Sequence, residues 1–528
     1  MSIDAFSLQI AWNGLRSICD EAFLSLMRSS FSTNIKERHD HSTAVLDADG
    51  RLVAQAELSL PIHLASMTGM IEALVERYAG RMQPGDIYCA NDPHVAGGTH
   101  LPDINLAAPV FHEGELVGFV ANIAHHADVG GAAAGSMSGG LTEVWQEGVR
   151  IPLVKLVSAG EMQRDVLDLM LLNMRLPQER LGDLNAQIAA CRLAEGRLGQ
   201  MASELGPDKL NVVYGEILSR SEQRMRSAIS AFPDGVYTFE DVLDDDGAGM
   251  QDLPIRLRVS KSGDSISFDF TGSSPQAMGN VNLTYNAVQS AVFYSLKALL
   301  DPELPNNQGV FAPVEIIAEE GSLLNCRPPG AVALRANTCQ RVVDVVLGAL
   351  GPGLPERAIG AANGANTSAV FAGNDPETGE GYVYLETLGG GMGARFTKNG
   401  KDGVQVHITN TSNLPVEAIE MEYPLRVLEY SLRNGSGGNG RHRGGMGLRR
   451  VVTPVGHDAV FSGVGERFRH TPWGFDGGEP GATGEFHMIA PDGTENRLPN
   501  KSLSLPLKEG HAVIIETPGA GGYGKPDD

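Results

Sequence analysis

Histidine and aspartate gather in two stretches of the N-terminal part of the chain, "NDPHVAGGTHLPD" at 91–103 and "ANIAHHADVGG" at 121–131. Together the two stretches contain three Asp and four His but no Lys or Arg. Imidazole and carboxylate groups bind divalent metals and exchange protons near neutral pH. The same residues also build turns, so the sequence leaves a metal site, an acid–base pair and turn chemistry to be weighed.

The histidine cluster extends beyond these stretches. Eight of the fourteen histidines fall between residues 39 and 126, where an even distribution would place two or three. Glycine pairs at 97–98 and 130–131 would let the backbone approach a ligand closely. These observations favour a functional site over chance scatter. The eight are His39, His41, His63, His94, His100, His112, His125 and His126.

The spacing His100-x-x-Asp103 places an imidazole and a carboxylate in one loop, and His125 or His126 arrives from the end of the next predicted strand. Two His and one carboxylate make three N/O ligands that leave positions open for water or substrate, as catalytic metal sites require. Such ligands accept zinc, manganese or iron. The alternative is that Asp92 and Asp103 form turns and that each His bonds a loop carbonyl. Taken together, the residues favour the metal.

Further titratable residues lie close to this pattern in the sequence. The candidates for catalytic proton transfer, or for orienting a ligating imidazole, are Asp40 in "KERHDHS", His126 and Asp128. Arg38 and Glu37 in the same run are candidates for substrate binding. The alternatives are an Asx turn at Asp128 and a solvated charge run at 37–40.

Composition excludes several classes of protein. A formal net charge of −23 over 528 residues argues against binding to a nucleic-acid backbone. The sequence has no uncharged apolar run of membrane-spanning length, and its start, "MSIDAFSLQI", does not resemble a signal peptide, so we expect a cytoplasmic protein without membrane contact. Its five cysteines are never paired as C-x-x-C, which argues against a zinc knuckle. Walker and Rossmann phosphate loops are absent too.

Apolar spacing predicts an α+β fold. A helix is expected over 4–28, a hairpin over 43–55, several strands over 86–126 and helical structure over 165–204. We divide this large mixed chain into three regions. They are 1–205, a strand–loop region with the His/Asp cluster and a long helix; 206–350, with three strand-length segments followed by a helix; and 351–528, β-rich and dense in glycine.

Several long motifs resemble the hydantoinase B family. They are "IKERHDHSTAVLDADGRLVAQ", "PIHLASM", "NDPHVAGGTHLPDI", "AHHADVGGAAAGSM", "DFTGSSPQAMGNVN", "LGGGMGAR" and "RNGSGGNGRHRGGMGLRR". The resemblance runs in the same order from about residue 5 to about residue 525. This family includes B-type subunits of ATP-dependent hydantoinases, the matching half of 5-oxoprolinases, B-type subunits of caprolactamases and α-type subunits of acetone carboxylases.

The resemblance implies a cytoplasmic hydrolase subunit that works with a partner. An A-type ATPase subunit would use ATP to phosphorylate a small cyclic amide, in a hetero-oligomer of the α2β2 type, and this chain would complete ring opening at a divalent metal. In the carboxylase branch the ion is held by residues that correspond to His100, Asp103 and His125. Two alternatives stay open: an α-type subunit of an ATP-dependent ketone carboxylase, and a non-catalytic structural subunit.

Overall fold

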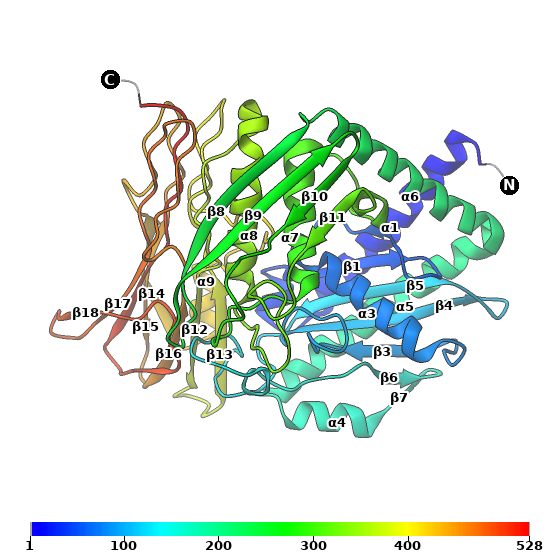
Figure 1. Ribbon diagram of the computed structural model, residues 1–528. Helices are drawn as coiled ribbons and strands as arrows, with labels where there is room; N and C mark the ends of the chain where they lie inside the picture. Colours follow the sequence, from blue (N-terminus) through cyan, green and yellow to red (C-terminus); the bar gives the residue numbers. More distant parts are fainter. Residues whose placement is uncertain (1–2, 527–528) are drawn as a thin grey trace.

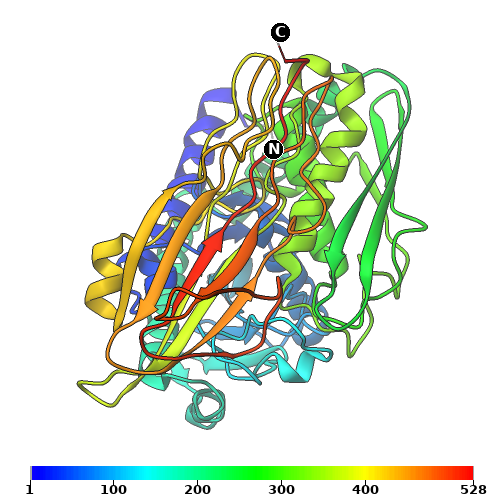
Figure 2. The same cartoon turned by 90° about the vertical axis from the view of Figure 1, so that its left-hand side faces the viewer.

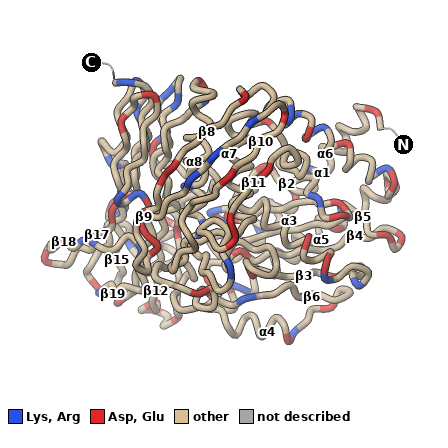
Figure 3. The backbone as a smooth tube through the Cα atoms, in the orientation of Figure 1, with Lys and Arg blue, Asp and Glu red and all other residues tan. Residues whose placement is uncertain are grey.

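The computed structural model describes residues 3–526, which form four β-sheets and the helices that cover them (Figure 1). The predicted α+β class is confirmed. Within the described residues no helix combines the length and apolar composition that crossing a membrane demands. Acidic and basic side chains are spread over all parts of the chain (Figure 3).

The N-terminal sheet has seven strands in the order β2-β1-β5-β4-β3-β6-β7, and each neighbouring pair is antiparallel. The predicted hairpin is β1 and β2, and the predicted strands at 86–126 are β3, β4 and β5. The bounds are β1 His41–Leu46, β2 Leu52–Gln55, β3 Ile87–Ala90, β4 Asp103–His112, β5 Glu115–His125, β6 Val154–Ser158 and β7 Glu161–Met162.

Helices cover both faces of this sheet, which explains why β1 to β3 are buried at every residue. Alternate side chains of a strand point to opposite faces. On β5, Phe119 and Ala121 join the core that includes α3, while Val120 joins the core of α1, α5 and α6. The bounds are α1 Ala5–Ser29, α2 Thr33–Lys36, η1 Pro61–His63, α3 Leu64–Tyr78, α4 Arg164–Leu172, α5 Pro177–Leu205 and α6 Pro207–Ser230.

The expected helical stretch 165–204 is two helices, α4 and α5. Leu176, between them, has φ 54° and ψ 57°, and Pro177 opens α5. The proline ring disfavours the right-handed helical conformation for the residue before it, so the chain turns there instead of continuing one helix. The predicted start of α1 is confirmed, because the Asp4 side chain accepts hydrogen bonds from the amides of Phe6 and Ser7.

The second sheet has four strands in the order β11-β10-β9-β8 and packs against α8. All residues of α8 are buried. This helix carries residues of the second region to the end of the N-terminal sheet where β4 begins. The bounds are β8 Gly235–Asp245, β9 Gln251–Ser262, β10 Ser265–Asp269, β11 Val314–Ile317, α7 Tyr285–Leu300 and α8 Arg335–Leu350.

Two further sheets form the β-rich C-terminal third, which faces the viewer in Figure 2. Phe371, Phe461, Phe486 and Ile515 belong to one apolar core between these sheets. Each of the four sheets draws its strands from one predicted region, although the domain boundaries themselves stay a prediction. The bounds are β12 Ser368–Asn374, β13 Gly381–Thr387, α9 Val416–Glu422, β14 Leu425–Leu432, β15 Leu448–Pro454, β16 Ala459–Val464, β17 Glu485–Ile489, β18 Glu495–Arg497, β19 Leu505–Leu507 and β20 Ala512–Glu516.

Candidate metal centre

Sheet register brings Asp103 and His125 together. Asp103 is the first residue of β4 and His125 the last residue of β5, and the two are direct partners in this antiparallel pair. Asp40 lies just before β1 on the other side of β5, where its carbonyl accepts a hydrogen bond from the His125 amide at 2.9 Å. Three neighbouring strands therefore place these side chains at one end of the sheet.

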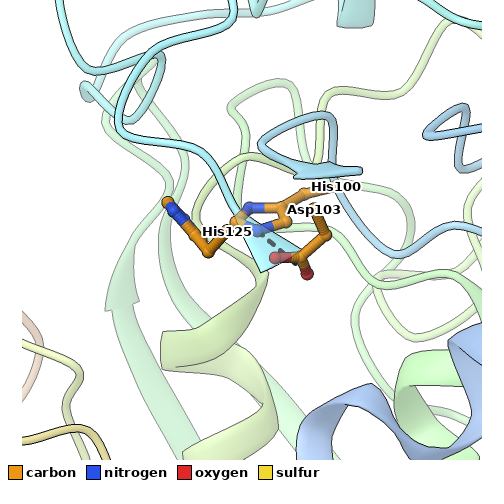
Figure 4. A group of neighbouring side chains, drawn as sticks. All are labelled: His100, Asp103 and His125. Carbon is orange, nitrogen blue, oxygen red and sulfur yellow. Dashed lines mark ion pairs between the residues drawn. The ribbon is translucent and has the colours of Figure 1, made fainter. Parts of the chain in front are cut away.

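His100 joins this pair through a turn in which its carbonyl accepts from the Asp103 amide at 3.3 Å. Its Nδ1 lies 3.1 Å from the Ala333 carbonyl, which can only accept, so Nδ1 carries the ring proton. The bare Nε2 faces Asp103 Oδ2 at 3.1 Å (Figure 4), and neither Nε2 nor Asp103 Oδ1 has a hydrogen-bond partner. Two buried acceptors that face each other are compatible with a bound cation.

His125 completes the ligand set, since one donor atom from each of His100, Asp103 and His125 lies within 4.8 Å of the others. The side-chain amide of Asn34 donates through Nδ2 to His125 Nδ1 at 2.9 Å, and the Nε2 atom of His125 lies 3.2 Å from Met137 Sδ. The ring proton is then on Nε2. Binding of an ion through Nε2 requires that proton to move to Nδ1 and the Asn34 side chain to turn its oxygen to the ring.

Two residues at the centre were not among the sequence candidates. The Arg335 guanidinium pairs with Asp103 Oδ2 and donates to Thr99 Oγ1 at 2.7 Å. His63 Nε2 lies 3.7 Å from one carboxylate oxygen of Asp103 and 3.7 Å from one of Asp40. His63 belongs to the histidine cluster, so the clustering of histidines could have indicated it. Nothing in the sequence indicates Arg335, because it lies 232 residues from its partner Asp103 along the chain.

Burial and neighbouring charges shift the pKa values of these three side chains towards the protonation states that a metal ligand needs near neutral pH. Burial lowers the pKa of His125 well below its usual value, and burial with the nearby Arg335 lowers that of His100. Burial alone would raise the pKa of Asp103, but His100, Arg335 and His63 together hold it well below its ordinary value. The set therefore offers two neutral imidazoles and one carboxylate, the protonation states that metal binding needs.

A small cavity of about 20 Å³ lies at this centre. Its volume is comparable to that occupied by one water molecule or ion. Asp40 faces it, and burial together with the Asp103 charge raises the pKa of Asp40 to about 7, against the opposing effect of Arg38. The wall includes Asp40, His63, His100, His125, Met137, Arg335, Thr387, Thr409 and Thr411.

The structure does not bring His126 or Asp128 to this cavity. His126 Nε2 lies 3.0 Å from Gln187 Oε1, on the side of α5. Asp128 accepts from the amides of Gly130 and Gly135 and pairs with Arg175 at 3.1 Å, as in the Asx-turn alternative.

Arg38 and Glu37 do not line the cavity either. Arg38 is fully buried, where it donates to Asn34 Oδ1, the Leu385 carbonyl and Thr387 Oγ1. Glu37 lies partly exposed, 3.8 Å from Lys36 Nζ. Arg38 thus holds the Asn34 side chain that donates to His125.

The predicted glycine contacts are with protein backbone. A Cβ on Gly97 would lie 2.3 Å from the Gly69 carbonyl carbon, and one on Gly130 would lie 2.0 Å from the Asn173 carbonyl oxygen. Close packing of Gly97 against α3 and of Gly130 against the end of α4 therefore explains these glycines, and a ligand is not needed to account for them.

The hydantoinase B/oxoprolinase family model matches residues 4–526. The chain belongs to the hydantoinase B/oxoprolinase family. Within this family it is 37% identical to an uncharacterized protein of Methanocaldococcus jannaschii, over 99% of this chain and 91% of that protein. It is 32% identical to a protein named as the B-type component of a D-/L-hydantoinase in Pseudomonas sp. (strain NS671), over 99% of this chain and 90% of the relative.

A third family relative is longer than this chain. The 5-oxoprolinase 1 of Arabidopsis thaliana is 34% identical over 99% of this chain, which spans only 42% of that protein. The fold also matches the ATP-dependent caprolactamase from Pseudomonas jessenii, with a TM-score of 0.92 and 28% identity over 99% of this chain and 92% of the other. An acetone carboxylase shares the fold, with a TM-score of 0.90 and 20% identity over 98% and 76% of the two chains.

Proposed function

We propose that this chain is the B-type subunit of an ATP-dependent cyclic amidohydrolase that opens a hydantoin, 5-oxoproline or related lactam ring. The observation that carries the proposal is the pair of buried acceptors that face each other, His100 Nε2 and Asp103 Oδ2, with His125 beside them. Relatives named as a hydantoinase component and as a 5-oxoprolinase, and a fold neighbour described as an ATP-dependent caprolactamase, support cyclic amides as the substrate class.

A partner subunit supplies the ATP-dependent step in this proposal. The sequence contains neither a Walker nor a Rossmann phosphate loop, and the name of the Pseudomonas relative describes one component of a larger enzyme. In the Arabidopsis 5-oxoprolinase, more than half of the chain lies outside the part that this chain matches. We expect an A-type ATPase subunit to phosphorylate the amide carbonyl oxygen, which converts a poor electrophile into one with a phosphate leaving group.

His100, Asp103 and His125 are the residues that would hold a divalent zinc, manganese or iron ion. When bound, such an ion lowers the pKa of a coordinated water towards about 7 and stabilises developing negative charge. Arg335 fixes the Asp103 carboxylate, and the Ala333 carbonyl fixes the ring of His100. These contacts keep Asp103 and His100 in place before the substrate arrives.

Asp40 is the group that we assign to proton transfer. It lines the cavity, and its pKa of about 7 allows it to accept and release a proton at neutral pH. His63 Nε2, 3.7 Å from one of its oxygens, is placed to orient the carboxylate. His126 and Asp128 are outside the cavity, so we leave them out of the proposed chemistry.

The test is an assay of ring opening by the chain together with its A-type subunit. We expect turnover that depends on ATP and does not require bicarbonate. Asp103→Asn should abolish turnover while ATP hydrolysis by the partner persists. A strict requirement for bicarbonate would indicate the ketone carboxylase instead, and full activity in Asp103→Asn would indicate a structural subunit. Native mass spectrometry of the co-expressed subunits checks the expected α2β2-type assembly.

A further inference from the structure

A cavity of about 850 Å³, here called the large cavity, lies directly against the small metal-centre cavity. Thr409 and Thr411 line both cavities. Along the segment 59–64, Ser59, Pro61 and Leu64 face the large cavity, while Leu60, Ile62 and His63 face the small one. Likewise, His39 lines the large cavity and Asp40 lines the small one. One layer of residues therefore separates the large cavity from the metal centre.

Three cationic side chains without an acidic partner line the large cavity. They are Lys297, Arg395 and Lys401, and none of them forms an ion pair within residues 3–526. Lys297 Nζ donates to Asn306 Oδ1 at 2.9 Å, and the one polar contact of the Arg395 guanidinium among the described residues is with Met392 Sδ at 3.3 Å. Arg395 and Lys401 are therefore free to bind a ligand, whereas Lys297 already donates to Asn306 and lies near Asp301 and Glu303.

Acidic residues are almost absent from the same wall. Glu57 is the one carboxylate among the lining residues, and Arg16 already pairs with it at 3.1 Å. The whole chain carries a formal charge of −23, so its long-range field repels anions. A local group of unpaired cations is what would overcome that field and hold an anion at this place.

Part of the same cavity wall is apolar. Phe293 and Phe311 stack on each other with ring centroids 3.7 Å apart, and Pro61, Leu64 and Tyr294 also line the wall. Ligand cavities of about 300–1,000 Å³ that combine apolar walls with a few polar anchors suit small organic molecules. A small ring that carries an anionic group matches the apolar and the cationic parts of this wall.

We propose that the large cavity binds the substrate through an oxyanion, a carboxylate or a phosphoryl group on a small ring, which Arg395, Lys401 and Lys297 hold beside the metal centre. The identity of the ring rests on the proposed function, whereas oxyanion binding does not. A charge-assisted hydrogen bond contributes about 1.5–3 kcal/mol, so loss of one cation should weaken binding by about ten-fold or more.

Calorimetric titration of the full-length chain with inorganic phosphate, after removal of metal by a chelator, tests the cavity alone. Arg395→Gln and Lys401→Gln should each raise Kd by about ten-fold. The matched controls Lys398→Gln, on the same loop, and Arg426→Gln, on β14, are exposed cations outside the cavity and should leave Kd unchanged. His100→Ala should also leave it unchanged. Equal Kd in all proteins, or no phosphate binding to the wild type, would overturn the proposal.

Turnover with the A-type subunit identifies which oxyanion is held. The pair of substrates is 5-oxoproline and the same five-membered lactam without its carboxylate. If the cations hold the carboxylate, Arg395→Gln raises KM about ten-fold for 5-oxoproline alone; if they hold the phosphoryl group, KM rises for both rings. Unchanged KM for both rings contradicts the proposal. Absence of turnover in the wild type counts against the proposed function, and the phosphate titration still decides the cavity.

Discussion

Replacement of the buried Glu147 carboxyl group should flatten the pH dependence of stability. Glu147 is fully buried, and its Oε1 accepts from the amides of Val332 and Ala333 at 2.8 and 2.7 Å, while Oε2 has no partner. Burial raises the pKa of Glu147 from 4.5 to about 8, against the opposing effect of the two backbone hydrogen bonds. The folded protein therefore holds this proton over a range in which the unfolded chain has lost it.

The sign and size of this change in unfolding free energy follow from the difference between the folded and unfolded pKa of Glu147. Because the folded pKa lies above the unfolded one, this group stabilises the fold most at low pH, and that stabilisation falls as the pH rises from about 4.5 to about 8. Each pKa unit corresponds to about 1.4 kcal/mol. Between pH 5 and pH 7 the wild type should lose about 2.5 kcal/mol of unfolding free energy through Glu147 alone. Glu147→Gln keeps an acceptor for both amides and should lose none through this position.

Urea unfolding of metal-free protein at pH 5 and pH 7 measures the effect. The change in unfolding free energy between the two pH values should be about 2.5 kcal/mol larger in the wild type than in Glu147→Gln. Glu76→Gln is the control, since Glu76 is exposed on α3 and should leave the wild-type pH dependence intact. If wild type and Glu147→Gln show the same pH dependence, burial does not hold the Glu147 proton and the reasoning is wrong.

Three further outcomes are expected. His100→Ala should weaken binding of Zn²⁺ at least about 100-fold in a competition titration, while His112→Ala, at the far end of β4, should leave it unchanged. Arg335→Met leaves the Asp103 carboxylate buried without its cation and should reduce the unfolding free energy of metal-free protein by about 3–5 kcal/mol, measured in urea. Gly97→Ala should cost about 3 kcal/mol, because its Cβ would lie 2.3 Å from Gly69 at φ 71°; Gly114→Ala, with φ 86° and open space, should cost about 1 kcal/mol. Equal losses in the two glycine variants would contradict the packing argument.

The grouping of His100, Asp103 and His125, here called the triad, was predictable because its signal is local. His100 and Asp103 lie in one loop, and His125 ends a strand that a short turn joins to β4, so pattern and spacing bring them together. The element bounds of β3, β4 and β5 likewise follow from short apolar runs between turns.

The supports of the triad were not predictable, because they come from distant segments. Ala333 and Arg335 lie more than 200 residues from the ligands that they hold. Their identities carry no mark of that role, since a backbone carbonyl serves at Ala333 and an arginine at 335 looks like any helical cation. His126 shows the opposite case: the sequence placed it beside His125, but successive residues at the strand end face opposite sides, and it bonds Gln187 instead.

The ion pair between Asp103 and Arg335 also sets an order of events in synthesis. The carboxylate emerges from the ribosome with the first region, but its cation follows only after 232 more residues. Long loops close late and slowly, so the N-terminal sheet can pair its strands while its ligand end is still open to water. Under the proposed function, capture of the metal then belongs to the last stage of maturation, after α8 has docked, and a ribosome-bound chain that ends before this helix should not retain a tightly held ion.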